Sequence, residues 1–287
     1  MEGDSRYITI RGLTIHYHVA LPEGPVKHRV FLLSAPGFLT SCWRLILPEL
    51  TEAGCLCVLC DMPGFGKSQF NDEIPAEQSL RARYLWGVLD TVDLERDGRL
   101  QCWHLMAHGS ACGTIVEMAL QQPDSAASLF MISPILYPPV SRALTPAVRS
   151  KAFSGLLRGW MQRNIVGPEH FSKLLTHVYG HEPRKGQAEL MRLPLLRLVG
   201  HEDVVRRLLL ESFSIDTGAL SSLFMPAMIL WGGEDHILGG AVPRRLREKD
   251  YPSAEYHVLA SAGHCAMETH SRAVRDFLRG WIREMWN

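Results

Sequence analysis

The sequence predicts an α/β protein with a mostly parallel central sheet that is flanked by helices and interrupted by a helical insertion after the sixth strand. Three observations predict this class. Short apolar runs alternate with helix-like segments in the first half of the chain, as they do in βαβ units. The alternation stops between residues 134 and 225 and resumes afterwards. At 287 residues and 46% hydrophobic composition, the chain is also large enough to bury a substantial core.

The first elements are two short alternating segments at residues 7–10 and 13–18, joined at Arg11-Gly12, which is typical of a β-hairpin. Parallel strands connected by helices are then expected. The predicted strands are 30–33, 55–60, 100–106 and 127–132, and the predicted helices are 43–52, 78–90 and 114–122.

The insertion consists of amphipathic segments, predicted as helices at 149–163, 168–178, 184–198 and 201–213. In the first of them, Leu156, Leu157, Trp160 and Met161 are expected to supply one apolar face. Strands are expected again at 227–231 and 255–259, followed by a last helix at 271–286. We therefore predict a core of residues 1–133 and 226–287 and a helical cap or lid of residues 134–225.

Composition restricts the function. Thirty basic and thirty acidic residues cancel, and no stretch concentrates one sign, so neither a nucleic acid nor a membrane surface is an expected partner. The acidic residues 1–5 precede no apolar run, so no signal peptide or lipid anchor is expected, and no apolar stretch is long enough to span a membrane. We expect a small-molecule substrate; the oligomeric state cannot be read.

The seven cysteines are an odd number, and Cys55, Cys57 and Cys60 share one apolar strand. Reduced, buried thiols of a cytoplasmic protein explain them best. A metal site at this triplet is not expected, because alternating strand residues face opposite sides and further ligands at zinc spacing are missing. We predict no metal and no cofactor.

Turns that follow parallel strands converge on one crevice and are where chemistry is expected. Residues 61–68 read D-x-P-G-x-G-x-S, residues 231–235 read W-G-G-E-D, and residues 262–264 read A-G-H. Together, in this order, they are similar to the signature segments of the α/β-hydrolase superfamily, and the resemblance covers the whole chain. It implies the α/β-hydrolase fold with a cap, Asp235 as the catalytic acid, and His264 as a general base oriented through Nδ1 by Asp235.

The nucleophile elbow of that family needs small residues around a nucleophile with positive φ, and two registers of residues 106–113 compete for it. The spacing from Leu105 to Pro123 places the apex at Gly109, between the small residues Ala107 and Ala111, which leaves no nucleophile. The other register places it at Ser110. His108 then occupies a position that should be small, although Cys112 and Gly113 suit the other side, and a one-residue bulge would be needed.

The resemblance also implies an oxyanion hole made of the backbone amides of Phe38 and Ser110. The loop before Phe38 departs from the family's common His-Gly pair, because this chain has Pro36-Gly37. In the Gly109 register, Ser110 follows the apex, where its amide would serve the oxyanion and its hydroxyl would cap the next helix.

Three functions remain open. The first is a serine hydrolase in which Ser110, His264 and Asp235 cleave an ester, a thioester or a C–C bond. The second is a non-covalent enzyme, such as a lyase, cyclase or cofactor-free oxygenase, in which the His264–Asp235 dyad is the general base. The third is a non-catalytic pseudo-hydrolase that binds a ligand. Apolar residues of the insertion favour an apolar or aromatic substrate, whereas its arginines would suit an anionic one.

Overall fold

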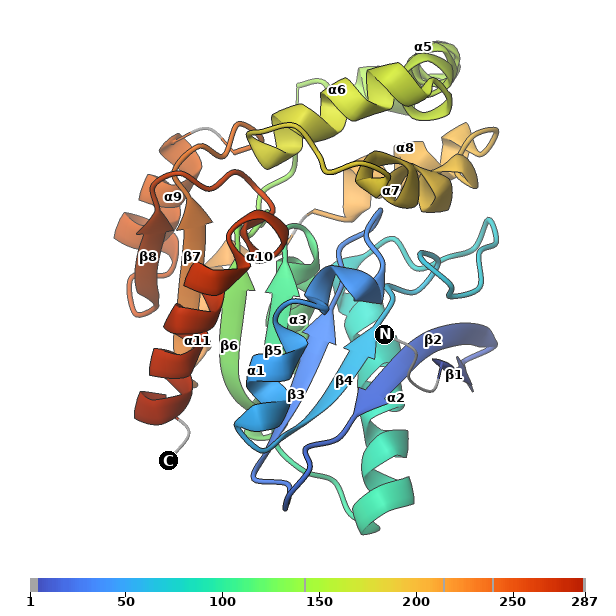
Figure 1. Cartoon of the computed structure of the whole chain (residues 1–287). Helices are drawn as coiled ribbons and strands as arrows, with labels where there is room; N and C mark the ends of the chain where they lie inside the picture. The colour runs from blue at the N-terminus through green and yellow to red at the C-terminus, as the bar shows by residue number, and fades with distance from the viewer. Residues whose placement is uncertain (1–4, 142, 214, 239, 286–287) are drawn as a thin grey trace.

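A computed structural model of the chain describes residues 5–141, 143–213, 215–238 and 240–285. Within these residues the strands form one eight-stranded sheet in the order β1-β2-β4-β3-β5-β6-β7-β8 (Figure 1). The hairpin strands β1 (Ser5–Ile10) and β2 (Leu13–Ala20) are antiparallel, and β2 also pairs antiparallel with β4. All later pairings are parallel, so the predicted fold class is confirmed.

The parallel strands coincide closely with the apolar runs of the sequence. They are β3 (His28–Leu33), β4 (Cys55–Cys60), β5 (Trp103–His108), β6 (Ala126–Ile132), β7 (Ala227–Gly232) and β8 (Glu255–Leu259). Alternate residues enter different layers, as the two-residue period of a strand requires. In β3, Val30 and Leu32 join one buried cluster, whereas Phe31 and Leu33 join the other.

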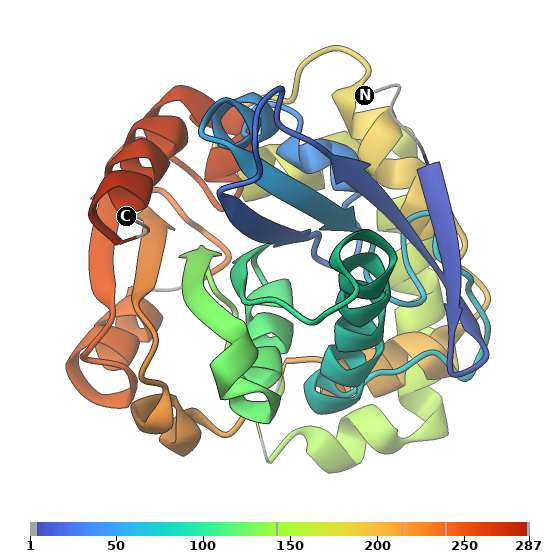
Figure 2. The ribbon, with the colours of Figure 1, turned by 90° about the horizontal axis from the view of Figure 1, so that it is seen from below.

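Helices cover both faces of the sheet, as Figure 2 shows. On one face lie α2 (Gln78–Asp97) and α3 (Ala111–Gln121), and on the other lie α1 (Leu47–Glu52) and α11 (Ser271–Met285). The expected single helix at 43–52 was wrong. A 3-10 turn, η1 (Thr40–Trp43), comes first, and α1 starts only at Leu47, with Pro48 in its first turn, where a missing N–H costs nothing.

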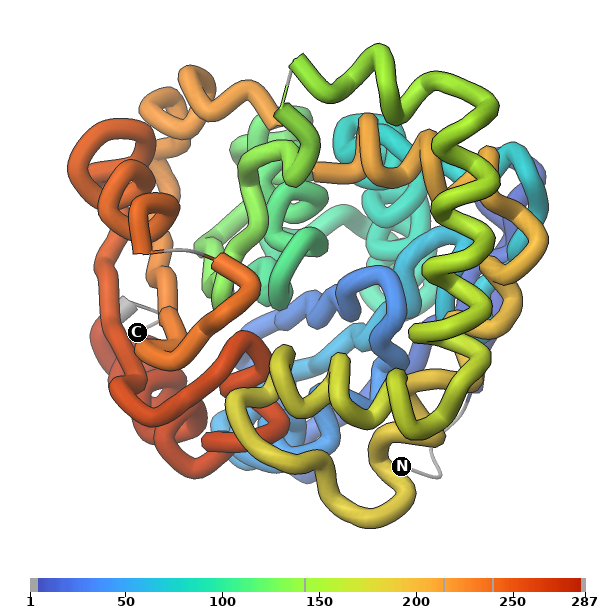
Figure 3. The backbone as a smooth tube through the Cα atoms, turned by 90° about the horizontal axis from the view of Figure 1, so that it is seen from above, coloured from blue at the N-terminus to red at the C-terminus, as the bar shows by residue number. Residues whose placement is uncertain are grey.

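The helical insertion lies over the carboxyl ends of the strands (Figures 1 and 3). Its helices, which we call the cap, are α4 (Thr145–Arg149), α5 (Lys151–Met161), α6 (Pro168–Tyr179), α7 (Gln187–Leu196) and α8 (Glu202–Glu211). The four α5 residues that were expected to supply one apolar face differ in burial. Leu157 and Met161 are buried, but Leu156 and Trp160 are 73% and 49% exposed.

Short elements complete the chain. They are η2 (Pro123–Ser125), η3 (Gln162–Val166), η4 (Thr217–Ser222), α9 (Ala241–Arg245), η5 (Leu246–Asp250) and α10 (Ala266–Thr269). Two sequence-based expectations fall on residues outside the described ranges. They are the absence of a signal peptide or lipid anchor at residues 1–4 and the end of the last helix at residue 286. Among the described residues, no helix is both long and apolar enough to cross a lipid bilayer. The division into a core and a cap domain stays a prediction.

Candidate active site

A buried aspartate–histidine pair lies at the carboxyl ends of the last two strands. Asp235 follows the turn after β7, and His264 lies between β8 and α10. The Nδ1 atom of His264 is 2.8 Å from Oδ2 of Asp235, and the two side chains are only 6% and 1% exposed. The other carboxylate oxygen, Oδ1, accepts hydrogen bonds from the backbone amides of Ile237 and Leu238. Asp235 is therefore held rigidly, and it fixes the plane of the imidazole ring.

The electrostatic balance at Asp235 favours the carboxylate. Burial alone would raise its pKa, but the hydrogen bond and charge of His264, with the amides of Ile237 and Leu238, outweigh burial and lower the pKa. An ionised Asp235 accepts from Nδ1–H of His264. The remaining nitrogen of the ring, Nε2, is then the one that is able to take a proton.

The turn between β5 and α3 has its positive φ at Gly109. This φ is +59°, whereas Ser110 has φ −70° in the right-handed helical region and is the N-cap of α3. A β-carbon built on Gly109 would lie 3.3 Å from Nε2 of His264 and 3.7 Å from the β-carbon of Ala35. This is the geometry of the Gly109 register. The side chain that would face the imidazole from the apex is absent.

Within the described residues, the hydroxyl of Ser110 lacks the hydrogen bond to the histidine that a serine nucleophile makes. Among the described contacts no hydrogen bond joins its hydroxyl to His264, and the hydroxyl does not cap α3, contrary to the sequence-based expectation. Its carbonyl oxygen accepts a 2.8 Å hydrogen bond from Nε2 of Gln78 in α2. The backbone of Ser110 is therefore anchored, while its side chain takes no part in the His264–Asp235 pair.

His108, which occupies a position that should be small only in the Ser110 register, packs between Phe38 and His264. It is 1% exposed, and its ring centroid lies 5.1 Å from that of Phe38 and 4.8 Å from that of His264. Its Nε2 lies 3.1 Å from the backbone carbonyl oxygen of His264, and only a protonated Nε2 can donate to that oxygen. Burial, with a smaller effect of the charge on His264, lowers the pKa of His108 to about 3, so the ring is neutral near pH 7.

The first loop carries Phe38, whose amide the sequence assigned to an oxyanion hole. In the structure that amide donates a 2.9 Å hydrogen bond to the carbonyl oxygen of Ala35. Leu195 of the cap lies against the same loop, 3.1 Å from a β-carbon built on Gly37. A substrate oxyanion would therefore have to replace the Ala35 carbonyl as the acceptor of this amide.

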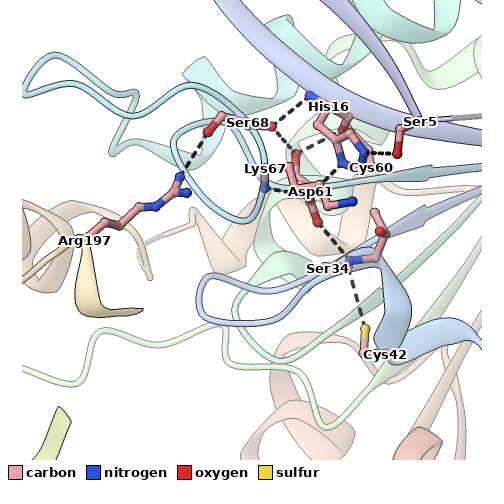
Figure 4. Close-up of polar contacts among 10 residues, drawn as sticks. Ser5, His16, Ser34, Cys42, Cys60, Asp61, Lys67, Ser68 and Arg197 are labelled. Atoms are coloured by element: carbon pink, nitrogen blue, oxygen red, sulfur yellow. Dashed lines mark hydrogen bonds and ion pairs between the residues drawn. The ribbon is translucent and has the colours of Figure 1, made fainter. Parts of the chain in front are cut away.

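A second buried aspartate, Asp61, anchors the chain directly after this loop. Asp61 follows β4 and accepts three hydrogen bonds, two of which Figure 4 shows, from Nδ1 of His16 and the amide of Lys67. The third donor is the amide of Thr40, at 2.8 Å. Asp61 and His16 are both fully buried. The carboxylate thus joins β2, the start of η1 directly after the first loop, and the turn after β4.

The turn after β4 is shaped around this carboxylate. Gly66 has φ +58°, and a β-carbon there would lie 2.3 Å from the carboxyl carbon of Asp61, so both conformation and space demand glycine. The sequence motif identified the turn that begins at Asp61, but it did not identify His16 as the hydrogen-bond partner of Asp61. The antiparallel pairing of β2 with β4 brings it in from 45 residues away, and no local pattern signals that pairing.

A small apolar cavity of about 170 Å³ lies between the core and the cap, next to the first loop. It is lined by Pro36 and Phe65 of the core, by Leu195, Leu198, Val205 and Leu208 of the cap, and by neighbouring residues up to Phe213. The same loop therefore borders both the His264 site and this cavity. No group of three or more His, Cys, Asp or Glu side chains in the described ranges is arranged to hold a metal ion.

A model of the alpha/beta hydrolase family matches residues 30–277, which is most of the chain. The chain belongs to the alpha/beta hydrolase family. This alpha/beta hydrolase is 25% identical over 291 residues to the 2-hydroxy-6-oxononadienedioate/2-hydroxy-6-oxononatrienedioate hydrolase of Paraburkholderia phymatum, covering 97% of this chain and 95% of the relative. It is 21% identical over 290 residues to the uncharacterized hydrolase YugF of Bacillus subtilis, covering 97% of both.

Solved structures show the same fold. A membrane phospholipase A superposes on this hydrolase with a TM-score of 0.79 at 18% identity, covering 99% of this chain and 87% of that one. The meta-cleavage product hydrolase CumD of Pseudomonas fluorescens IP01 has a TM-score of 0.73 at 17% identity, covering 97% of each chain. The family and the names of its relatives confirm the prediction of a hydrolase-class enzyme.

Proposed function

We propose that this protein is a hydrolase that works without a covalent serine intermediate and in which the His264–Asp235 dyad activates water. One observation carries the proposal. A β-carbon on Gly109 would lie 3.3 Å from Nε2 of His264, so a side chain at this position would face the base, and the glycine offers it no hydroxyl. The intact dyad, with its 2.8 Å hydrogen bond, supports a role for the base that does not depend on a nucleophilic side chain.

The proposed chemistry is general-base catalysis on a small carbonyl compound. Nε2 of His264 takes a proton from water as the oxygen attacks the carbonyl carbon, and the ionised Asp235 stabilises the imidazolium that forms. The carbonyl oxygen becomes an oxyanion, and we assign its stabilisation to the amides of Ser110 and Phe38, the latter after it leaves Ala35. Collapse of the adduct breaks the bond to the leaving group, which takes the proton from Nε2.

The substrate class follows from the relatives only in outline. Relatives are named hydrolases of 2-hydroxy-6-oxononadienedioate, a compound whose name includes a ketone carbonyl, and other structural neighbours are named esterases. Esters, thioesters and C–C bonds next to a carbonyl share an electrophilic carbon that water is able to attack. We therefore propose one of these bonds as the one that is cleaved.

A paired-variant experiment tests the proposal. The wild type, Ser110→Ala and His264→Ala proteins are incubated with a fluorophosphonate probe and assayed with 4-nitrophenyl esters, a thioester and the dienedioate named for the relatives. We expect no labelling of the wild type, unchanged turnover in Ser110→Ala, and a fall in kcat of about 10²- to 10⁴-fold in His264→Ala.

Each alternative has its own outcome. Labelling of the wild type at Ser110 would establish covalent catalysis and overturn the proposal. Normal turnover by His264→Ala would exclude the dyad as the base. A compound that raises the melting temperature of the wild type but is never consumed would identify a ligand-binding protein instead of an enzyme.

A further inference from the structure

Two apolar spaces meet at helix α8, one on each side of it. The inner space is the 170 Å³ cavity between the cap and the core. The outer space is a groove of about 430 Å³ between α5 and α8, lined by Phe153, Leu156, Leu157 and Trp160 of α5 together with Val205 and Leu209 of α8. Figure 1 shows α8 beneath α5, on the side of α5 that faces the core. Val205 and Leu209 line both spaces.

Val205 and Leu209, which line both spaces, lie between them and divide them. Val205 and Leu209 are four residues apart, so they lie on the same face of α8. Both are half-buried, whereas Val204 and Leu208 are fully buried in the core cluster. Arg158 of α5 forms an ion pair with Glu202 of α8 at 2.9 Å, which ties the two helices together at one end of the groove. Val205 and Leu209 are therefore the residues that the two spaces share.

The outer groove exposes apolar surface that the core does not use. Leu156 and Trp160 are 73% and 49% exposed, although they are large and lie one helical turn apart on α5. Contiguous exposed apolar surface of this kind on a soluble protein commonly marks a binding site. Because the groove adjoins the inner cavity, it suits a ligand that reaches inward. A partner that only covered the groove from outside would leave the cavity unused.

The inner cavity and the candidate reaction centre border the same loop. Pro36 lines the cavity, and its neighbour Ala35 has its β-carbon 3.7 Å from a β-carbon built on Gly109. The loop 35–37 is therefore shared by the cavity and the His264 site. The polar lining of the inner cavity comes from Ser212, and the groove is lined by apolar side chains throughout. A charged arm would lose its hydration here without a partner, so the lining selects an apolar one.

We propose that the two spaces form one binding site for a long, unbranched apolar arm of the carbonyl substrate, with Val205 and Leu209 as its gate and selectivity residues. This inference rests on the proposed function, because it places the reacting carbonyl at Gly109 and His264. The arm passes Pro36 and crosses the gate, and its far end lies against Trp160. Substrates with short arms fill only the inner cavity.

Binding of unreactive 2-alkanones, from 2-butanone to 2-dodecanone, tests the site without turnover. Affinity is measured by calorimetry and by the emission of Trp160, taken as the difference between wild type and Trp160→Phe. In the wild type each added methylene is expected to strengthen binding about three- to fourfold. In Leu209→Trp, which fills the gate, the gain should stop once the inner cavity is full.

Two further variants keep the test decisive if Leu209→Trp does not fold. Leu156→Ser and Trp160→Ala change only exposed positions, and they should weaken the longest ketones about tenfold while leaving the short ones unchanged. Leu193→Ser, at a 52% exposed leucine of α7 that lines neither space, is the matched control and should change neither.

Three results would overturn the site. One is an affinity that does not rise with chain length in the wild type. Another is a Leu209→Trp protein whose affinity for the ketones rises with chain length as it does in the wild type. The third is a fall in sedimentation mass on Trp160→Ala with the ketone series unchanged, because a second copy of the chain then covers the groove. Ketone binding as expected without turnover of any ester would refute the proposed function and leave the site in place.

Discussion

At the scale of single residues, the decisive feature of the elbow is Gly109, which has a hydrogen atom where every other residue has a β-carbon. Gly109 adopts φ +59° without the strain that any other residue pays there, and the side chain it lacks would point at His264. An L-residue in this conformation costs of order 1–3 kcal/mol and persists only where the surrounding structure holds it there. The missing side chain opposite His264 and the missing backbone strain therefore have the same cause, the glycine at position 109.

Restoring a hydroxyl at the apex should restore covalent reactivity. In Gly109→Ser the new β-carbon would lie about as close to Nε2 of His264 as the 3.3 Å contact built on the glycine, which brings the hydroxyl within reach of the base. We expect labelling by a fluorophosphonate probe that the wild type lacks, and a loss of about 1–3 kcal/mol in the free energy of unfolding from the strained backbone.

Gly109→Ala is the control for this variant, because it has the same strain and no hydroxyl. It should lose similar stability and remain unlabelled. Labelling should also persist when Ser110→Ala is added to Gly109→Ser. Loss of the label on that addition would show that Ser110, and not the new serine, reacts with the probe.

At the scale of elements, the sequence predicted what local patterns determine. The run 55–60 is a strand with the expected ends, because six consecutive apolar residues are buried on both faces. The spacing of the elbow favoured Gly109, and the backbone agrees. The start of α1 was missed because the 3-10 turn η1 precedes Pro48. The partner of Asp61 was missed because the pairing of β2 with β4 joins segments that lie far apart in the sequence.

That long-range pairing makes Asp61 the link between three elements, and its replacement should loosen the first loop. In Asp61→Asn, an amide group takes the place of one acceptor oxygen and faces a backbone N–H, either Thr40 or Lys67. An unsatisfied buried donor costs about 1–3 kcal/mol, so urea unfolding should show a loss of that size. Turnover should fall as well, because Thr40 follows the loop that carries Phe38.

A matched change elsewhere separates the loop from general destabilisation. Asp93 is also buried and accepts from the indole of Trp103 and the amide of Gln101, at the opposite end of the strands. Asp93→Asn should lose comparable stability while turnover by the folded protein stays unchanged. Equal loss of turnover in both variants would show that Asp61 has no particular role in the loop.

At the scale of the whole molecule, two buried histidines should determine how stability falls with acid. Burial lowers the pKa of both His104 and His108 to about 3, below the ordinary value near 6.5. The unfolded chain therefore takes up two protons between about pH 6.5 and pH 3 that the native protein does not. Stability from these groups is complete above pH 6.5 and is lost progressively as the pH falls towards 3.

The expected slope follows from the count of protons. Each proton contributes about 1.4 kcal/mol per pH unit, so the free energy of unfolding, measured in urea at pH 4.5–6, should carry a contribution of about 2.7 kcal/mol per unit from the pair. His108→Gln and His104→Gln should each reduce the slope by one proton, and His181→Gln, at an exposed position, should not. A wild-type slope that His108→Gln leaves unchanged would mean that the ring beside His264 is charged in the native protein, and the neutral donor assigned to its Nε2 would be wrong.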